Sequence, residues 1–300
     1  MKIIWLQDLD PCCNVGGGQL NDWSVIRKGI ERSHNISVIT PQNMDAKGLD
    51  GADLVIISNC VSFPQEYIKN VCAKYPYIFF HHDFNFYTGR LYYPMEKNNF
   101  TNCNRELWLP LYQNAKLHIW LSPLHREAYL VAFPELKSFP DITIPSCLDV
   151  DMWKSIEGVE RQKNTVIGVN CLAHFKGRYN IYNYAIEHPE LHFTFIGGGS
   201  PIDIPNATYI PYIKNEELPK LYSQFEYFIH LPAYTEPFGR VSCEAILSGC
   251  KIITNENNGA FSFGFMRSPD RDIRNIRDHL RLAALSWWEE TEKIMGWLVI

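Results

Sequence analysis

Several features are missing from this sequence of 300 residues, and each absence argues against a class of protein. No apolar run approaches the roughly 20 residues that a membrane-spanning helix needs. Lys and Arg number 28 against 33 Asp and Glu, so the chain lacks the basic surplus typical of proteins that grip nucleic acid or anionic membranes. The first residues lack the pattern of a secretory signal. We therefore expect a cytoplasmic protein, with attachment to a membrane surface as the alternative.

Nucleotide-binding and disulfide signatures are missing as well. The chain contains neither the GxGxxG dinucleotide fingerprint nor the GxxxxGK[ST] phosphate loop. Its nine cysteines are an odd number without a CxxC pair, so we expect reduced thiols. Apolar residues are plentiful: the chain is 46% hydrophobic and 14% aromatic, enough for substantial cores, and this excludes disorder.

Short apolar segments alternate with amphipathic stretches, which predicts parallel sheets covered by helices on both faces. The pattern restarts after a polar segment, 145–164, so we expect two doubly wound α/β domains. Their boundaries are predicted at 1–148 and 149–270, with a helical tail, 271–300, packing back on the first domain. The predicted strands are 2–7, 36–40, 53–58, 77–81, 117–122, 141–144, 165–170, 191–196, 207–210, 227–231 and 251–254. The predicted helices are 20–32, 64–75, 179–188, 215–224 and 242–248.

A run of glycines follows a predicted strand in each half of the chain. Residues 16–18 and residues 197–199 are each three consecutive glycines. Such turns let backbone N–H groups approach a phosphate or a sugar hydroxyl, and a helix N-terminus adds positive charge. Ligands of parallel sheets bind at this carboxyl edge. A ligand loop is one interpretation of each turn, and a plain tight turn is the other.

The most specific pattern is TEPFGRVSCEA, residues 235–245. Glu236 falls in a loop, and Glu244 follows in the first turns of a predicted helix. A carboxylate can accept two hydroxyl hydrogen bonds, which suits sugar diols. Gly239 lets the backbone approach a phosphate where the helix begins. Glu244 alone reads as a solvated residue at a helix start, but the whole string indicates a sugar-nucleotide site.

This string resembles the signature of the retaining glycosyltransferases of family 4. Their GT-B fold consists of two Rossmann-like domains facing a central cleft, and this is the fold class that the resemblance implies. The resemblance covers about residues 1–260 and is strongest at 236–249. Further segments that carry it are Gly17-Gly18, His82-Asp83, 145–149 (PSCLD), 171–177 (CLAHFKG), 195–199 (FIGGG) and 215–222 (NEELPKLY).

The resemblance implies a role for each matching residue. Lys176 would neutralise the diphosphate as it leaves, Glu236 would hold hydroxyls of the donor sugar, and Glu244 would hold the ribose diol. His82 would hydrogen-bond the donor sugar, although the sequence leaves open whether His81 or His82 points inward. The remaining donor-binding residues follow from their motif positions: Gly17, Gly18, Gly198, Tyr212, Ile213, Phe238, Gly239 and Arg240.

The chain departs from the family at one basic residue. The arginine that usually precedes the family lysine is replaced by Cys171. We therefore expect the phosphate charge to be met by Lys176, by backbone amides and by Arg178 or Arg240.

Two groups of charged residues have plainer interpretations. Asp8 and Asp10 could bind a metal, but we interpret them as solvated loop acids, because the family lacks an Asp-x-Asp site and is usually metal-independent. No metal site is therefore predicted. Residues 125–127 (HRE) read as the charged face of a helix.

Two aromatic segments leave a structural and a functional interpretation open. Residues 84–93 are rich in Phe and Tyr and include Arg90, so they form either a core or a platform for an acceptor. Trp287, Trp288 and Trp297 suggest either a membrane edge or packing of the tail against the first domain, and we favour packing.

The resemblance thus implies a retaining, metal-independent hexosyl- or pentosyltransferase. It would move a sugar from a nucleotide-diphosphate sugar, with a UDP-sugar favoured, to a hydroxyl of a glycan, lipid or small molecule, and no further cofactor is expected. One alternative is transfer to a modified nucleic-acid base, which the net charge of -5 disfavours. The other is a catalytically inactive binding module of the same fold, which the missing arginine favours and the intact Lys176, Glu236 and Glu244 disfavour.

Overall fold

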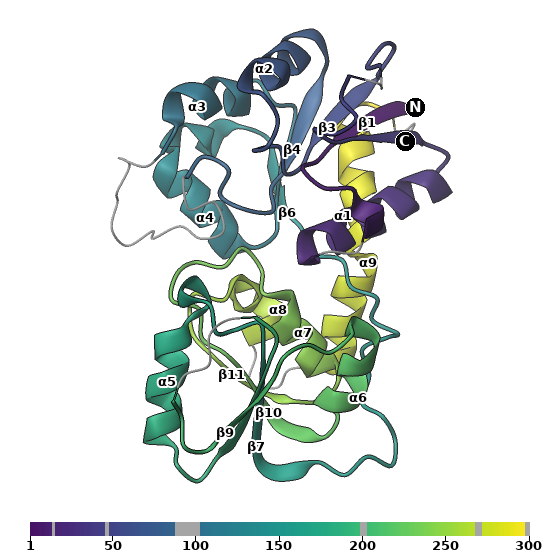
Figure 1. Cartoon of the computed structure of the whole chain (residues 1–300). Coiled ribbons are helices and arrows are strands. Elements are labelled where there is room, and N and C mark those ends of the chain that lie inside the picture. The colour runs from purple at the N-terminus through teal and green to yellow at the C-terminus, as the bar shows by residue number, and fades with distance from the viewer. Residues whose placement is uncertain (14–15, 46–47, 88–102, 199–202, 268–271, 298–300) are drawn as a thin grey trace. The chain divides into compact units, whose positions relative to one another are not determined.

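The computed structural model describes residues 1–13, 16–45, 48–87, 103–198, 203–267 and 272–297. The chain divides into two compact units, each with its own parallel sheet (Figure 1). Unit 1 consists of Met1–Cys147 with Leu282–Ile300, and unit 2 is Leu148–Arg281.

Unit 1 contains six parallel strands in the order β2-β1-β3-β4-β5-β6. The strands are β1 (Lys2–Leu6), β2 (Asn35–Ile39), β3 (Leu54–Ile57), β4 (Tyr77–Phe80), β5 (His118–Trp120) and β6 (Asp141–Thr143). The chain runs from β1 to β2 on one side and then to β3 on the other. The strand order therefore reverses between β1 and β3, and ligands of such sheets bind beyond the carboxyl ends of the strands at this point.

The helices of unit 1 are α1 (Gly17–Glu31), α2 (Gln65–Lys74), α3 (Arg105–Gln113) and α4 (Pro123–Ala132). Helix α4 begins where the Ser122 side chain accepts a hydrogen bond from the His125 N–H, with Pro123 as the first helical residue. Asn104 caps α3 in the same way by accepting from the Leu107 N–H. Helix α3 was not predicted, because Pro110 in its interior is a residue that usually ends a helix.

The core of unit 1 is aromatic and contains three histidines. His81, His118 and His125 are at most 1% exposed. The His81 ring stacks on Trp120 at 4.0 Å between centroids, and its Nε2 lies 3.0 Å from Nδ1 of His118. The interpretation of residues 125–127 as a charged face is thus wrong for His125, which faces the core, while Arg126 pairs with Asp141.

The end of the chain completes unit 1. Helix α9 (Ile273–Ile294) carries Trp287, whose ring stacks on Trp5 of β1 at 5.5 Å between centroids. Trp288 donates its Nε1–H to the Val25 carbonyl of α1 at 2.7 Å. A Cβ at Gly29 would lie 2.4 Å from the Trp288 ring, so only glycine leaves room for this indole. In Figure 1 the yellow end of α9 lies beside α1 and β1.

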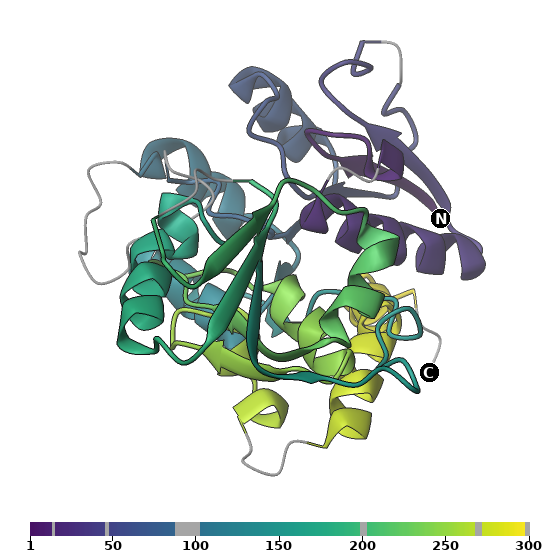
Figure 2. The same cartoon turned by 60° about the horizontal axis from the view of Figure 1, so that its bottom comes forward.

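Unit 2 contains five parallel strands in the order β11-β10-β7-β8-β9. These strands are β7 (Gln162–Val169), β8 (His192–Ile196), β9 (Ala207–Ile210), β10 (Phe225–His230) and β11 (Lys251–Thr254). Its helices are α5 (Arg178–Glu187), α6 (Leu218–Tyr222), α7 (Arg240–Leu247), α8 (Gly264–Arg267) and the first part of α9. Figures 1 and 2 show α5 and α6 on opposite sides of the strands. The strand order reverses between β7 and β10, so this pair marks the expected ligand edge.

Every predicted strand forms, with ends that differ by a few residues. The predicted helical tail is the single helix α9 over its described residues. The predicted helix 215–224 is instead a short 3-10 turn, Asn215–Glu217, followed by α6. Over the parts of the chain that the structure describes, no helix is both long and apolar enough to cross a membrane.

Candidate functional site

Lys176 is held at the ligand edge of unit 2 by the glycine that follows it. A 3-10 turn, His174–Lys176, comes after β7, and Gly177 then starts α5 with a φ of 93°. A Cβ at Gly177 would lie 1.6 Å from the Leu231 carbonyl oxygen, beyond the end of β10. Only glycine fits this contact, because of both the positive φ and the close approach. The Lys176-Gly177 pair therefore fixes the lysine between the carboxyl ends of β7 and β10.

Glu236 joins Lys176 and His230 into one group, here called the Glu236 cluster. Its Oε1 lies 2.5 Å from Lys176 Nζ, and its Oε2 lies 3.1 Å from His230 Nε2. Burial alone would raise the pKa of the Glu236 carboxyl, but the charges of Lys176 and His230 outweigh burial and hold that pKa well below its usual range. The cluster thus keeps a carboxylate ionised at the point where the strand order reverses.

The backbone on both sides of Glu236 is fixed by a second loop. The Glu236 N–H donates to the Asn257 carbonyl, and the Gly259 N–H donates to the Glu236 carbonyl. Ser242 of α7 lies 3.2 Å through its Oγ from His230 Nδ1 and accepts a 2.9 Å hydrogen bond from Asn258. These contacts orient the imidazole, so that Nε2 faces the carboxylate.

Glu244 lies on α7, one turn after Arg240. Its side chain is buried, and Arg240 Nε lies 3.8 Å from its Oε1. Burial raises the pKa of the Glu244 carboxyl, and Arg240 opposes this effect only in part. The interpretation of Glu244 as a solvated residue at a helix start is therefore wrong. A buried acid with one distant cation is better satisfied by a ligand that offers hydroxyl donors.

The two glycine runs, 16–18 and 197–199, have different local structures. Gly17 and Gly18 form the first turn of α1 in unit 1. In unit 2, the Gly198 N–H donates to the Asn170 side chain at 3.2 Å, and a Cβ at Gly198 would meet no atom within 4 Å. Gly198 thus leaves open space beside its backbone, while Gly199 lies outside the described residues.

The other predicted donor-binding residues of unit 2 occupy two environments. Tyr212 is 76% exposed in the loop after β9, and Ile213 beside it is half-buried. Phe238 is buried, and its ring meets Phe263 edge-on at 6.3 Å between centroids. Gly239 precedes α7 with a φ of 82°, as a glycine at a helix start allows. The exposed Tyr212 ring is therefore available to stack on a ligand, whereas the buried Phe238 ring packs inside unit 2 against Phe263.

Of the two adjacent histidines in unit 1, only His82 lies at the glycine turn. His82 Nε2 lies 2.8 Å from Oδ1 of the buried Asp22, which also accepts from Ser58 Oγ at 2.9 Å. A Cβ at Gly18 would lie 3.6 Å from Nδ1 of His82. Since a carboxylate only accepts, it holds the imidazole with its proton on Nε2 and leaves Nδ1 beside the glycine turn.

Cys171 is packed in a way that excludes the family arginine. The residue is 1% exposed, and a Cβ on Gly168 would lie 2.7 Å from its Sγ. Burial raises the pKa of the Cys171 thiol to about 12, so the side chain is a neutral core residue. An arginine at this position of this chain would have to bury its charge in an apolar core.

Three partners of the predicted residues were not predicted, namely His230, Asn258 and Asp22. His230 ends strand β10 as His82 follows β4, so a polar residue at a strand's carboxyl end was the available signal. Asp22 lies inside an amphipathic helix, and its position gave no such signal.

Among the described residues, no three His, Cys, Asp or Glu side chains come together in an arrangement that could hold a metal ion. Residues 88–93, with Arg90, lie outside the described residues.

Comparison with known proteins identifies the fold. No family model matches the sequence. Over 118 residues the chain is 25% identical to spore coat protein SA of Bacillus subtilis strain 168, and this match covers 32% of the chain and 31% of that protein. Sucrose-phosphate synthase from Thermosynechococcus elongatus superposes with a TM-score of 0.75 over 99% of both chains, at 14% identity. HepE from Anabaena, solved with UDP and glucose, has a TM-score of 0.61 over 99% of this chain and 100% of that chain, at 16% identity. The predicted GT-B fold is thus confirmed.

Proposed function

We propose that this chain is a retaining glycosyltransferase that transfers a sugar from a nucleotide-diphosphate sugar, with UDP as the favoured nucleotide, to a hydroxyl acceptor. One observation carries the proposal: Lys176, Glu236 and His230 meet where the strand order of unit 2 reverses, on a GT-B fold. An ammonium and a sugar-binding carboxylate in contact are what a donor with a diphosphate next to a sugar requires.

The Glu236 cluster suggests how the donor is received. Without donor, the Lys176 ammonium is neutralised by Glu236 at 2.5 Å. A diphosphate carries more charge than one carboxylate and competes for this ammonium. Once Lys176 has moved to the diphosphate, Glu236 turns its Oε1 to the sugar hydroxyls. His230 stays at Oε2 and keeps the carboxylate ionised. Glu244 binds the ribose diol, and the backbone at Gly198 and Gly239 approaches the phosphates.

The proposed reaction proceeds on one face of the sugar and needs no metal. The acceptor oxygen bonds to the anomeric carbon, while the bond from this carbon to the diphosphate oxygen breaks and leaves its electron pair on the phosphate. The acceptor proton passes to that phosphate oxygen, so charge and atoms balance. Lys176 stabilises the growing negative charge, and His82 hydrogen-bonds the donor sugar.

The direct test is binding and slow hydrolysis of UDP-, GDP- and ADP-glucose by the full-length chain. A ligand at 100 times its dissociation constant stabilises the native state by about 2.7 kcal/mol, which a thermal melt detects. We expect stabilisation and hydrolysis with UDP-glucose, unaffected by EDTA. Stabilisation without hydrolysis or transfer would instead favour an inactive binding module, and no stabilisation by any of the three would refute the proposal.

Replacing Glu244 with alanine should raise the KM for the donor about 10- to 100-fold and leave kcat nearly unchanged. The reason is that ribose contacts are equal in the ground and transition states, and hydrogen bonds to a charged group contribute about 1.5–3 kcal/mol. Steady-state kinetics with varied donor measure this, and the exposed Glu216→Ala is the matched control. A large fall in kcat at saturating donor would show that Glu244 has another role.

Replacing Asp22 with asparagine should lower kcat by roughly tenfold or more while nucleotide binding to unit 2 stays unchanged. The amide can donate to His82 Nε2, which would reverse the tautomer that the carboxylate imposes. Ser58→Ala is the control, because it removes the other partner of Asp22 and leaves the His82 contact in place. If both variants retain full activity, the orientation of His82 does not matter for transfer.

A further inference from the structure

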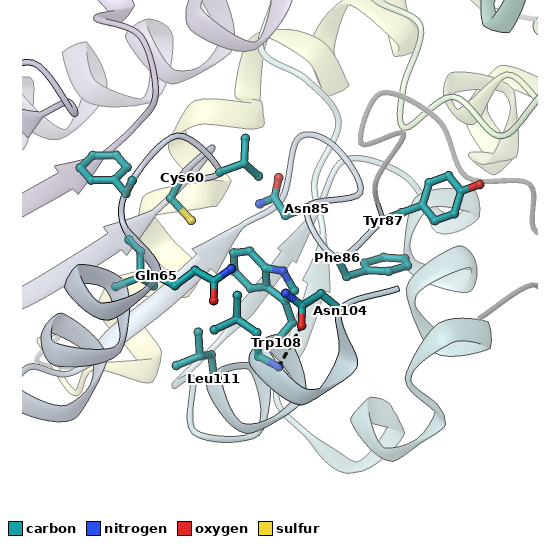
Figure 3. Close-up of a pocket in the computed structure, with 12 residues that line it drawn as sticks. Cys60, Gln65, Asn85, Phe86, Tyr87, Asn104, Trp108 and Leu111 are labelled. Carbon is teal, nitrogen blue, oxygen red and sulfur yellow. Dashed lines mark hydrogen bonds between the residues drawn. The ribbon is translucent and has the colours of Figure 1, made fainter. Parts of the chain in front are cut away.

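A pocket in unit 1 has a chemistry that the proposed donor site does not explain. It encloses about 210 Å³ and is drawn in Figure 3. Its walls come from the loop after β3, from α2, from the loop after β4 and from α3. The apolar residues that line it are Cys60, Val61, Phe63, Ile68, Phe86, Leu107, Trp108 and Leu111, and the polar ones are Gln65, Asn85, Tyr87 and Asn104.

Asn85 is the unusual member of this lining. It is 7% exposed, and neither its Nδ2 nor its Oδ1 has a hydrogen-bond partner among the described residues. Leaving such a group unsatisfied costs about 1–3 kcal/mol. The backbone of the next residue is held in place, since the Asn104 N–H donates to the Phe86 carbonyl. A buried amide with both of its functions unused indicates a ligand that both donates and accepts.

The size and charge of the pocket restrict that ligand further. A cavity of about 150 Å³ lined by apolar side chains can hold benzene, so this pocket has room for a substituted ring or a fused pair of rings. None of the twelve lining residues that the structure describes is an Asp, Glu, Lys, Arg or His, so this part of the wall offers no charge to compensate a charged ligand. Trp108 and Phe86 offer aromatic contact to such a ring (Figure 3).

The pocket lies at the same edge of the sheet as His82. Asn85 follows His82 by three residues after β4, and Cys60 follows Asn59 after β3. A Cβ at Gly18 would lie 3.8 Å from Nδ2 of Asn59 and 3.6 Å from Nδ1 of His82. The two strand ends that build the pocket therefore also border the glycine turn.

We propose that this pocket, here called the Asn85 pocket, binds the apolar part of the acceptor. The acceptor is a neutral compound with a ring-sized apolar group. It carries one polar substituent, a hydroxyl or an amide, that pairs with Asn85, and a second hydroxyl that receives the sugar. The acceptor role rests on the proposed function, whereas binding of such a compound does not.

The first test measures binding alone, with 2-naphthol and with naphthalene as the probe that lacks the hydroxyl. By calorimetry or Trp fluorescence of the full-length chain, we expect 2-naphthol to bind about tenfold more tightly than naphthalene, the ratio that one satisfied hydrogen bond gives. Asn85→Leu should abolish this preference without weakening naphthalene binding. Asn70→Leu, an exposed position of α2 outside the pocket, is the matched control and should change neither affinity.

A second variant protects the test if Asn85→Leu does not fold. Val61→Phe adds a ring at the half-buried rim of the pocket and should weaken binding of both probes at least tenfold. Unchanged binding of both probes to Val61→Phe, or no binding to the wild-type protein, would overturn the Asn85 pocket as a ligand site.

The second test asks for transfer to 2,6-dihydroxynaphthalene, which offers one hydroxyl to Asn85 and one to the donor. Sugar transfer to this compound that Val61→Phe reduces at least tenfold, with hydrolysis of UDP-glucose unchanged, would support the acceptor role. Hydrolysis and naphthol binding without transfer would overturn the acceptor role alone. If the wild-type protein neither hydrolyses UDP-glucose nor transfers its sugar, the proposed function is refuted, while the result on binding of the naphthols still holds.

Discussion

Replacing Lys176 with alanine is expected to lower kcat for sugar transfer about 100- to 1,000-fold, which is the range for removing one preorganised charge at a developing oxyanion. The effect on nucleotide affinity should be smaller, because the negative charge on the leaving diphosphate grows as the glycosidic bond breaks. The upper end of the range is expected here, since Cys171 stands where the family has an arginine and is sealed in the core. Steady-state transfer and direct UDP binding, measured on the same variant, separate the two effects.

The matched control is Lys251→Ala in the same unit. Lys251 Nζ pairs with Glu226 Oε1 at 2.8 Å, but Lys251 is exposed and begins β11, at the opposite end of the strands from His230. Exposed pairs contribute about 0–1 kcal/mol, so kcat and stability should both stay near wild type. If Lys176→Ala also stays within about threefold of wild type, the lysine is not part of the reaction. The proposed transfer then loses its main electrostatic element.

Acid should destabilise unit 1 well before it protonates most carboxylates. Burial lowers the pKa of His118 to about 4 and that of His125 to about 3, and it holds the pKa of His81 well below its usual range. In the unfolded chain these histidines take up protons near pH 6.5, while the folded core keeps them neutral. Stability is therefore complete above about pH 6.5 and falls as the pH drops towards 4. The loss at pH 4 is roughly 3 kcal/mol for His118 and roughly 3 kcal/mol for His125, and His81 adds to it in the same direction.

Denaturant melts of the full-length chain between pH 7 and pH 4 measure this loss. His125→Phe keeps an aromatic ring among Phe84 and Tyr129 and removes one titrating group, so its stability should depend less on pH. His192→Phe, at an exposed position of unit 2, should leave the pH dependence as it is in the wild-type chain. A stability that is flat from pH 7 to pH 4 would contradict the buried, neutral state of these rings.

The sequence predicted the strands well and the contacts between them poorly. The strands are short apolar runs bounded by turn residues, and that signal is local. The contact between Lys176 and Glu236 joins residues 60 positions apart, and it depends on β10 lying next to β7. No single segment determines the strand order, so this contact was not predicted. The family resemblance gave each of the two residues a role but did not pair them.

The histidines of unit 1 show the same limit. Apolar and polar residues are mixed in the segments that contain His81, His82 and His125. The sequence pattern therefore does not show which of these histidines lie in the core and which at the surface. Their environments follow from packing: His81 lies under Trp120, whereas His82 reaches Asp22 across the glycine turn. The Asn85 pocket was also beyond prediction, because the lining residues come from 60–68, 85–87 and 104–111, and these three stretches must fold together before a pocket exists.

The contact of Trp288 with Val25 joins positions 263 residues apart and sets an order of events during synthesis. A ribosome releases β1 and α1 first, yet the indoles that cover Trp5 and fill the space at Gly29 emerge only after all of unit 2. The nascent N-terminal half must therefore wait with apolar surface uncovered, which makes it a candidate for chaperone binding. Unit 2, whose residues are contiguous, can finish folding before the unit that was begun earlier.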